Sequence, residues 1–328
     1  MSVTIKDVAA AAGVSIATVS RVLAHKDRFY SPATAEKIMT VARDLGYQKN
    51  SAAVELVTQK SQVLGVIVSS TQTNFADQII AGIQDTAFAR DLSVIILYAG
   101  VNDDRLQQKA IQTVIERSVR GILILALELN DANRQLLDQT PIPHVFLSTT
   151  SGHEQDAFVA SDDFKIGQRA TEYLINKGHT RIGLAAVEAT SYVGQKRLAG
   201  YRNAMANHQL PIESEWIQAG HFTYADGLVA MRQWGPTPPI DAVVAMSDLA
   251  AVGVLNQATD FHLNIPNQLA IVSIDGTDLV KWVRPQLTSI TQAFYDMGVA
   301  GVNLLLNTDT QPPAAQLLPF KLDERASS

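Results

Sequence analysis

The chain has 328 residues, of which 47% are hydrophobic and 18% are charged, and its mean hydropathy is close to zero. This balance excludes a disordered chain, and the length favours two or three domains. The absence of Cys excludes a disulfide framework and a thiolate nucleophile or metal site, and the longest apolar runs, such as residues 121–127, fall short of the roughly 20 residues that cross a bilayer.

The net charge of −6 is unevenly distributed along the chain. Residues 1–60 carry a net charge of +3 and the remainder carries −9. This asymmetry favours a small basic module attached to a large acidic body. The first residues, with Asp7 and Gly13, do not have the pattern of a signal peptide, so we expect a cytoplasmic protein.

Two short helices are predicted at the N-terminus. Thr4 can cap a helix that continues to Ala12, and Gly13 is suited to end it. Ser15 can cap the next helix only two residues later. This spacing is typical of a helix-turn-helix unit.

The second helix has two different faces at 100° per residue. Val19 and Val22 lie on the side expected to pack inward, while Ile16, Ala17 and Arg21 lie on the other. The outer face is poor in charge and suits the major groove, where Arg can contact guanine and small apolar groups can contact thymine methyls.

A third helix is predicted from the cap at Ser31 to Gly46. A helical hairpin that binds no nucleic acid, with Arg21 as a solvated surface charge, fits this pattern equally well.

Specific residues favour DNA binding. The string from Val3 to Leu23, with Ala12-Gly13-Val14-Ser15-Ile16-Ala17-Thr18-Val19-Ser20-Arg21 at its centre, closely resembles the N-terminal domain of the lactose-repressor/galactose-repressor (LacI/GalR) family. Asp44-Leu45-Gly46-Tyr47 and Asn50 continue the resemblance. It implies the following DNA-binding residues: Thr4, Ser15, Ile16, Ala17, Thr18, Ser20, Arg21, Tyr47, Asn50, Ala53 and Leu56.

The linker departs from the family pattern. Lys49 replaces a Pro, and Glu55 places a negative charge beside the DNA phosphates. Leu56 matches the family leucine that wedges into the minor groove. We therefore expect a helix-turn-helix domain over residues 1–49 and a hinge over residues 50–61.

Residues 62–328 alternate short apolar strands with longer helical stretches. The predicted strands cover residues 63–68, 92–97, 121–125, 158–161, 181–185, 242–245 and 269–274. The predicted helices cover residues 75–90, 104–117, 164–176, 195–208, 224–234 and 249–261. Apolar strands separated by helices imply an α/β core of two doubly wound parallel sheets.

The family resemblance implies a core like that of periplasmic sugar-binding proteins. In this arrangement residues 62–161 and 292–322 form the first subdomain, and residues 162–290 form the second. The final strand, expected over residues 315–322, would be one of three crossings between them. A small molecule would bind in the cleft between the two, at the carboxyl ends of the strands.

The expected cleft residues follow predicted strands or match family positions. They are Asn74, Phe75, Asp162, Arg197, Phe222, Ser247, Asp248 and Asp275. Arg and carboxylate side chains can bind paired hydroxyl groups, and aromatic rings can cover the apolar face of a sugar. Each also has a simpler interpretation: the Phe residues as core, the Asp residues as helix caps, and Arg197 as a surface ion pair.

The ligand is expected to be a sugar or a sugar phosphate, because Ser191 stands where the purine-binding branch of the family has an Arg. The sequence contains no glycine-rich nucleotide motif and no metal-ligand spacing among its His residues, so no enzyme, cofactor or metal is expected. The last strand is not followed by leucine heptads, which predicts a dimer on a pseudo-palindromic operator.

These observations predict a repressor of carbohydrate-utilisation genes that binds double-stranded operator DNA and is not associated with a membrane. A catabolite-control regulator with a phosphoprotein corepressor is an alternative. A sugar-binding transport protein is a third, disfavoured by the fused helix-turn-helix.

Overall fold

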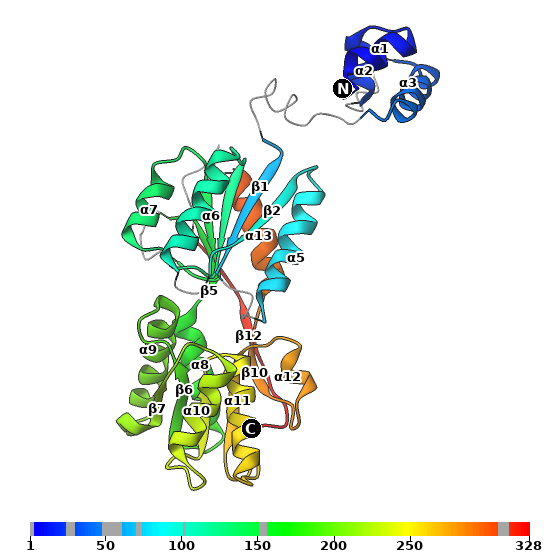
Figure 1. Cartoon of the computed structure of the whole chain (residues 1–328). Helices are drawn as coiled ribbons and strands as arrows, with labels where there is room; N and C mark the ends of the chain where they lie inside the picture. Colours follow the sequence, from blue (N-terminus) through cyan, green and yellow to red (C-terminus); the bar gives the residue numbers. More distant parts are fainter. Residues whose placement is uncertain are drawn as a thin grey trace. The chain divides into compact units, whose positions relative to one another are not determined.

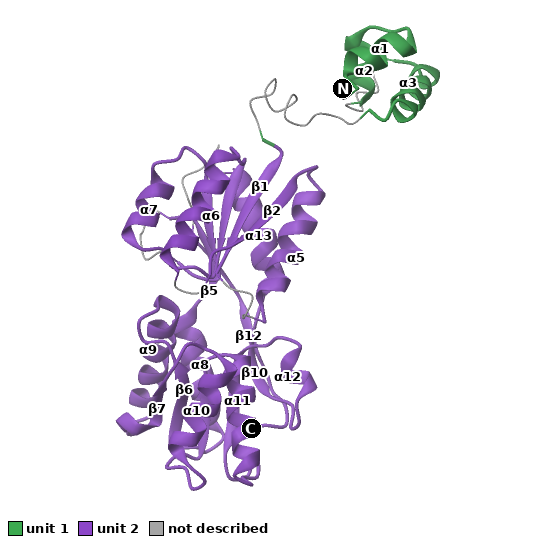
Figure 2. Cartoon of the chain, viewed as in Figure 1, with its two compact units in different colours: residues 1–61 green, residues 62–328 purple. Residues whose placement is uncertain are grey.

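In the computed structural model of the chain, the described residues are 3–23, 30–47, 61–69, 74–100, 103–150, 156–307 and 315–328. The chain divides into two compact units, residues 1–61 and 62–328 (Figure 2). The predicted hinge lies almost wholly outside the described residues.

The first unit contains three described helices, α1 (Ile5–Ala12), α2 (Ile16–Leu23) and α3 (Pro32–Asp44). Apolar side chains at helical spacing build its core, which consists of Val8, Ala9, Ala12, Val19, Val22, Ile38 and Ala42. These bounds agree with the predicted helices to within two residues, because caps and breaks surround each helix.

Two six-stranded sheets form the second unit (Figure 1). The first has the order β11-β5-β4-β3-β1-β2 and is parallel throughout. Its strands are β1 (Val63–Val68), β2 (Ser93–Tyr98), β3 (Gly121–Leu125), β4 (His144–Leu147), β5 (Phe158–Ser161) and β11 (Ala315–Leu318).

Helices cover both faces of this sheet. The four helices are α5 (Ala76–Phe88), α6 (Asp104–Glu116), α7 (Asp131–Asp138) and α13 (Phe294–Asn307). Alternate residues of β3 point to opposite faces: Leu123 packs in the core beneath α5 and α13, and Ile122 packs in the core beneath α6 and α7. Burial on both faces explains the continuous apolar runs of the sequence.

The second sheet has the order β12-β10-β9-β8-β6-β7, and only its β10–β12 pair is antiparallel. Its strands are β6 (Ile182–Val187), β7 (Ile217–Ala219), β8 (Ala242–Ala245), β9 (Ala270–Asp275), β10 (Thr288–Gln292) and β12 (Phe320–Asp323). Its helices are α8 (Asp163–Asn176), α9 (Tyr192–Asn207), α10 (Tyr224–Trp234), α11 (Asp248–Asp260) and α12 (Leu279–Trp282), with a 3₁₀ turn at Ser214–Trp216.

The chain passes between the two sheets three times: after β5, after β10 and between β11 and β12 (Figure 1). The single final strand expected over residues 315–322 is wrong, because Pro319 has no N–H to continue the ladder. Phe320–Asp323 therefore belongs to the second sheet, where Leu322 pairs with Ile290, rather than to the first subdomain.

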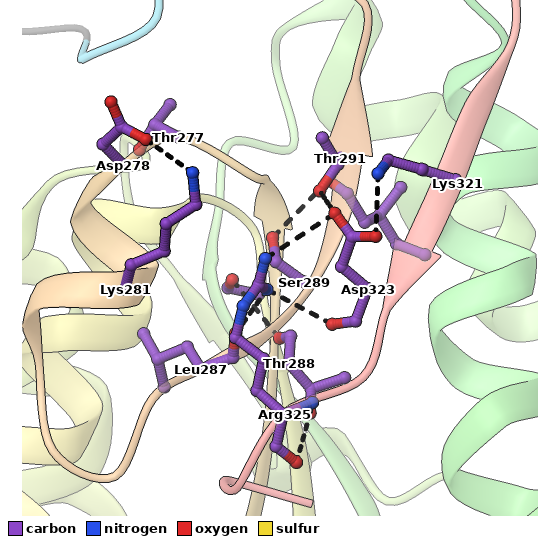
Figure 3. Close-up of polar contacts among 12 residues, drawn as sticks. Thr277, Asp278, Lys281, Leu287, Thr288, Ser289, Thr291, Lys321, Asp323 and Arg325 are labelled. Atoms are coloured by element: carbon purple, nitrogen blue, oxygen red, sulfur yellow. Dashed lines mark hydrogen bonds and ion pairs between the residues drawn. The ribbon is translucent and has the colours of Figure 1, made fainter.

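Polar contacts fasten β12 to β10 (Figure 3). The Thr291 hydroxyl of β10 donates to Asp323 Oδ2 of β12 at 2.7 Å, and within β12 Lys321 Nζ lies 3.0 Å from Asp323 Oδ1. The Arg325 guanidinium donates to the Leu287 carbonyl at 2.9 Å. These contacts hold the last part of the chain on the second subdomain.

Candidate functional site

The turn between α1 and α2 is built from local hydrogen bonds. The Thr4 N–H and hydroxyl each donate to Asp7 Oδ2 at 2.7 Å at the start of α1. Gly13 ends this helix in the left-handed conformation, with φ of 66°. Ser15 then caps α2 by accepting the Thr18 N–H at 3.1 Å. Together these residues set the start of α2.

The outward face of α2 carries four of the eleven expected DNA-binding residues, Ile16, Ala17, Ser20 and Arg21. The exposed residues of the expected set are Thr4, Ser15, Ile16, Ala17, Ser20 and Arg21. Thr18 is half-buried, with its hydroxyl 2.8 Å from that of Ser15, and Tyr47 packs against the core of the unit. Asn50, Ala53 and Leu56 lie outside the described residues.

A cavity of about 390 Å³ lies between the two sheets of the second unit. The first subdomain contributes Ser69, Asn74, Phe75, Ala126, Leu127, Glu128, Ser148 and Thr149. The second contributes Glu188, Thr190, Ser191, Val193, Arg197, His221, Phe222, Thr223, Met246, Ser247, Leu249 and Asp275. This size suits one small molecule.

The backbone around the cavity is strained. Ala126, Ser148, Phe222 and Asp275 all line it and have positive φ values of 48°, 60°, 63° and 119°. Such conformations are unfavourable for residues other than glycine and are concentrated at functional sites. The strain is consistent with a cavity that is shaped to bind a ligand.

Arg197 belongs to the part of the cavity wall that the second subdomain forms. It is buried, and its Nε donates to Asp163 Oδ1 at 2.8 Å while Nη1 donates to the Met246 carbonyl at 2.6 Å. Its Nη2 lies 3.9 Å from Asp275 Oδ1. The fork is thus held in one orientation by three groups. The proposed surface ion pair for Arg197 is wrong, since both carboxylates are buried.

Asp275 is buried at the end of β9 and accepts a hydrogen bond from Gln292 Nε2 at 3.1 Å. Burial raises the pKa of Asp275 well above its ordinary value, Arg197 opposes the rise, and the nearby acids Asp248 and Asp163 add to it. A carboxyl group at the cavity wall that can hold its proton can donate as well as accept hydrogen bonds.

Two aromatic side chains border the cavity from opposite subdomains. Phe75 stacks on Phe294 with ring centroids 4.7 Å apart, which fixes its orientation. Phe222 lies under the Arg197 guanidinium, 5.8 Å from the ring centroid. The cavity therefore combines apolar ring surfaces with polar groups.

Two expected residues do not reach the cavity. Asp162 is the cap of α8, where it accepts the Lys165 N–H at 3.1 Å, and its neighbour Asp163 makes the contact to Arg197. Asp248 is fully buried and accepts hydrogen bonds from Ser273, Thr277 and Ser289. Helix capping and internal bonding, rather than ligand contact, account for their positions.

Sequence reasoning missed three ionisable residues of the cavity. Glu128 and Glu188 follow β3 and β6, and His221 Nδ1 lies 3.0 Å from Glu188 Oε1. Desolvation raises the pKa of Glu128, whereas the hydrogen bond that His221 makes to the Glu188 carboxylate raises the pKa of His221. Glu188 comes directly after β6 and Glu128 comes three residues after the last residue of β3, and this position near a strand end was the available signal.

Two hydrogen bonds join the subdomains across the cavity. The Tyr192 N–H, in the second subdomain, donates to Glu128 Oε1 at 2.8 Å. Asn74 Nδ2, in the first, donates to Thr277 Oγ1 at 2.7 Å. Thr277 in turn donates to the buried Asp248 at 2.8 Å, so Asp248 supports this bond from behind. Both bonds would break if the subdomains moved apart.

The described residues contain no helix that is long and apolar enough to cross a membrane, and no group of three or more potential metal ligands.

Each of the two units is similar to a known protein family. Residues 4–50 match the family model of bacterial regulatory proteins, lacI family, and residues 171–328 match a periplasmic binding protein-like domain. Catabolite control protein A of Staphylococcus xylosus is 31% identical over 332 residues, with all of both chains covered.

Two solved structures are similar over nearly the whole chain. The lac repressor dimer bound to operator and the anti-inducer ONPF has a TM-score of 0.89 and 26% identity, covering 100% of this chain and 99% of that one. The transcriptional regulator CelR in complex with cellobiose has a TM-score of 0.77 and 29% identity, covering 99% and 100%.

Proposed function

Because the chain belongs to the lacI family of bacterial regulatory proteins, we propose that it represses carbohydrate-utilisation genes under the control of a small sugar. The chain is a DNA-binding transcription regulator and not an enzyme. We expect it to be located in the cytoplasm, where operator DNA is found.

The DNA-binding role assigned to the outer face of α2 is a proposal. Arg21, Ile16 and Ala17 are exposed on one side of this helix, opposite the buried Val19 and Val22. We expect them to face base edges in the major groove, with Ser15, Thr18 and Ser20 near phosphates. A two-fold dimer would place one such helix in each half-site, as expected for an operator with pseudo-palindromic symmetry.

The observation that carries the sugar-binding proposal is the cavity between the sheets. Arg197 is held in place by Asp163 and the Met246 carbonyl, next to Asp275 and the ring of Phe222. Phe75 supplies an aromatic face from the other subdomain. Fixed polar groups and aromatic faces together suit a polyol. CelR, a similar protein, was solved with cellobiose.

A bound sugar would control the distance between the subdomains. A ligand shifts such an equilibrium only through its different affinities for the two states, typically by about 1–3 kcal/mol. The cross-cavity hydrogen bonds of Glu128 and Asn74 stabilise the arrangement of the subdomains in this structure. We expect closure to change the spacing of the two DNA-binding units of a dimer.

A thermal-shift screen of the purified chain against mono- and disaccharides tests the proposal. A ligand that binds only the folded state raises the unfolding midpoint through mass action. We expect at least one sugar to raise it, and Arg197→Ala to abolish that rise. No shift with any sugar would contradict sugar control.

Full-length similarity to catabolite control protein A favours one second candidate, a regulator whose corepressor is a phosphoprotein. A midpoint that rises with a phosphorylated carrier protein, and with no sugar, would support this alternative instead.

A further inference from the structure

The ionisable side chains that line the cavity are mostly acidic. Among the described residues they are one base, Arg197, three acids, Glu128, Glu188 and Asp275, and His221 beside Glu188. Burial favours the neutral form of Asp275, so Glu128 and Glu188 supply the negative charge. Arg197 is already engaged by Asp163 and by Asp275. The positive charge that an anionic ligand would need is therefore already compensated by the carboxylate of Asp163.

The positive ends of the neighbouring helices are occupied as well. A helix N-terminus can bind a phosphate through its free N–H groups. At α9, however, Glu128 accepts the Tyr192 N–H at 2.8 Å and Ser191 Oγ accepts the Gly194 N–H at 3.0 Å.

The same holds for the other helices that begin at the cavity. At α10, Asp226 Oδ2 accepts the His221 N–H at 2.9 Å and Thr223 Oγ1 accepts the Asp226 N–H at 3.2 Å. At α11, Ser247 caps the helix and the acid Asp248 is its first residue. At α5, Asp77 lies in the first turn. Side chains of the protein thus already cap the ends of α9, α10 and α11, and α5 carries an acid in its first turn.

We propose that the cavity selects an uncharged, hydroxyl-rich ligand and rejects the phosphorylated form of the same ligand. Carboxylates only accept hydrogen bonds when ionised, so Glu128 and Glu188 favour a ligand that offers several hydroxyl donors. A phosphate adds a charge of about −1.5 to −2 at neutral pH and would be repelled by both. This inference rests on the proposed sugar-binding function and narrows the choice between a sugar and a sugar phosphate.

Calorimetric titration of the full chain with matched pairs tests the proposal. The pairs are glucose and glucose 6-phosphate, ribose and ribose 5-phosphate, and sucrose and sucrose 6-phosphate. We expect at least one free sugar to bind and its phosphate to bind at least about tenfold more weakly, with a gap that narrows as salt is added.

The two possible failures can be distinguished. A phosphate that binds as tightly as its parent sugar, or more tightly, would overturn the selectivity and leave sugar control in place. No binding by either member of any pair would count against the proposed function itself.

The double variant Glu128→Gln/Glu188→Gln tests the cause of the selectivity. It keeps oxygen acceptors at both positions and removes two negative charges. The sugar phosphate should then bind at least about threefold more tightly than it binds the wild type, by loss of repulsion.

Glu116→Gln/Glu213→Gln is the matched control, because both residues are exposed and neither lines the cavity. It removes the same charge and should leave the difference in affinity between the sugar and its phosphate as it is in the wild type. If the difference in affinity between the sugar and its phosphate were equal in the wild type and in both double variants, shape alone would reject the phosphate and the proposal would be wrong.

Discussion

Glu128 of the first subdomain and Tyr192 of the second are joined across the cavity by a 2.8 Å hydrogen bond. The donor is the backbone N–H of the first residue of α9, and the acceptor is a carboxylate oxygen. Since a negative group at a helix N-terminus is stabilised by the helix dipole, this contact favours the arrangement of the subdomains in which the two residues meet.

Glu128→Ala should shift the subdomains toward a more open state. Loss of a partly exposed, charge-assisted hydrogen bond should lower the ratio of closed to open molecules about fivefold. Labels at Arg117→Cys and Glu213→Cys, both exposed and on different subdomains, report the separation, and the natural chain has no Cys to interfere.

Glu128→Gln is the control for this shift, since its amide oxygen can still accept the Tyr192 N–H. The distance between the two labels in this variant should stay near the wild-type distance. An unchanged distance distribution in Glu128→Ala would show that the bond does not govern closure.

Arg197→Ala should lower both ligand binding and stability. The substitution leaves the buried carboxylate of Asp163 without its cation, a change that typically costs about 3–5 kcal/mol of unfolding free energy. Denaturant unfolding measures the stability loss, and calorimetry at a temperature where the variant is folded measures sugar affinity. Wild-type affinity in a folded Arg197→Ala protein would remove Arg197 from the site.

Gly167→Ala should weaken the packing that positions Arg197. A Cβ at Gly167 on α8 would collide with the Arg197 carbonyl on α9, which is backbone and cannot rotate away. The expected loss of about 1–3 kcal/mol exceeds the gain of about 0.5–1 kcal/mol from the better helix former.

Arg169→Ala, on the exposed side of the same helix, serves as the comparison for Gly167→Ala. It should change the unfolding free energy by less than about 0.5 kcal/mol. Equal urea midpoints for the two variants would show that the helices separate without penalty.

Asp275→Asn should change how stability depends on pH. In the unfolded chain Asp275 should release its proton at the ordinary pKa of an Asp, about 3.9. In the folded protein its pKa is raised, so the proton is retained to higher pH. Wild-type stability is therefore lost as pH rises from the unfolded pKa through the folded one.

The introduced Asn cannot release a proton, so the Asp275→Asn variant does not lose stability in this way as pH rises. The unfolding free energy of the variant minus that of the wild type should therefore increase with pH. Urea unfolding of both proteins at several pH values from 5 to 8 measures the difference. A difference that stays constant with pH would mean that Asp275 does not hold its proton.

Much of the fold could be predicted from local pattern. The predicted strand over residues 63–68 agrees with β1, and the helix predicted over residues 104–117 agrees with α6 to within a residue. Both have uniform periodicity between clear breaks. The start of α9 was placed three residues late, at residue 195, so the capping role of Ser191 and the bond to Glu128 were missed.

The residues that line the cavity could be predicted only in part. Asn74, Arg197 and Asp275 were expected in the cleft and do line it. Asp248 also follows a strand, but its carboxylate turns inward because Ser273 and Ser289 come from neighbouring strands and donate to it. Such contacts depend on sheet order, which a single strand pattern does not specify.

The measurement that tests the central claim most directly is operator affinity with and without the sugar that binds the cavity. An operator duplex selected from a random library would be titrated with the full chain at fixed salt, by fluorescence anisotropy. We predict that the sugar changes operator affinity by at least about fivefold, and that Arg197→Ala removes this change. Operator affinity that stays the same while the cavity is saturated with sugar would contradict the account.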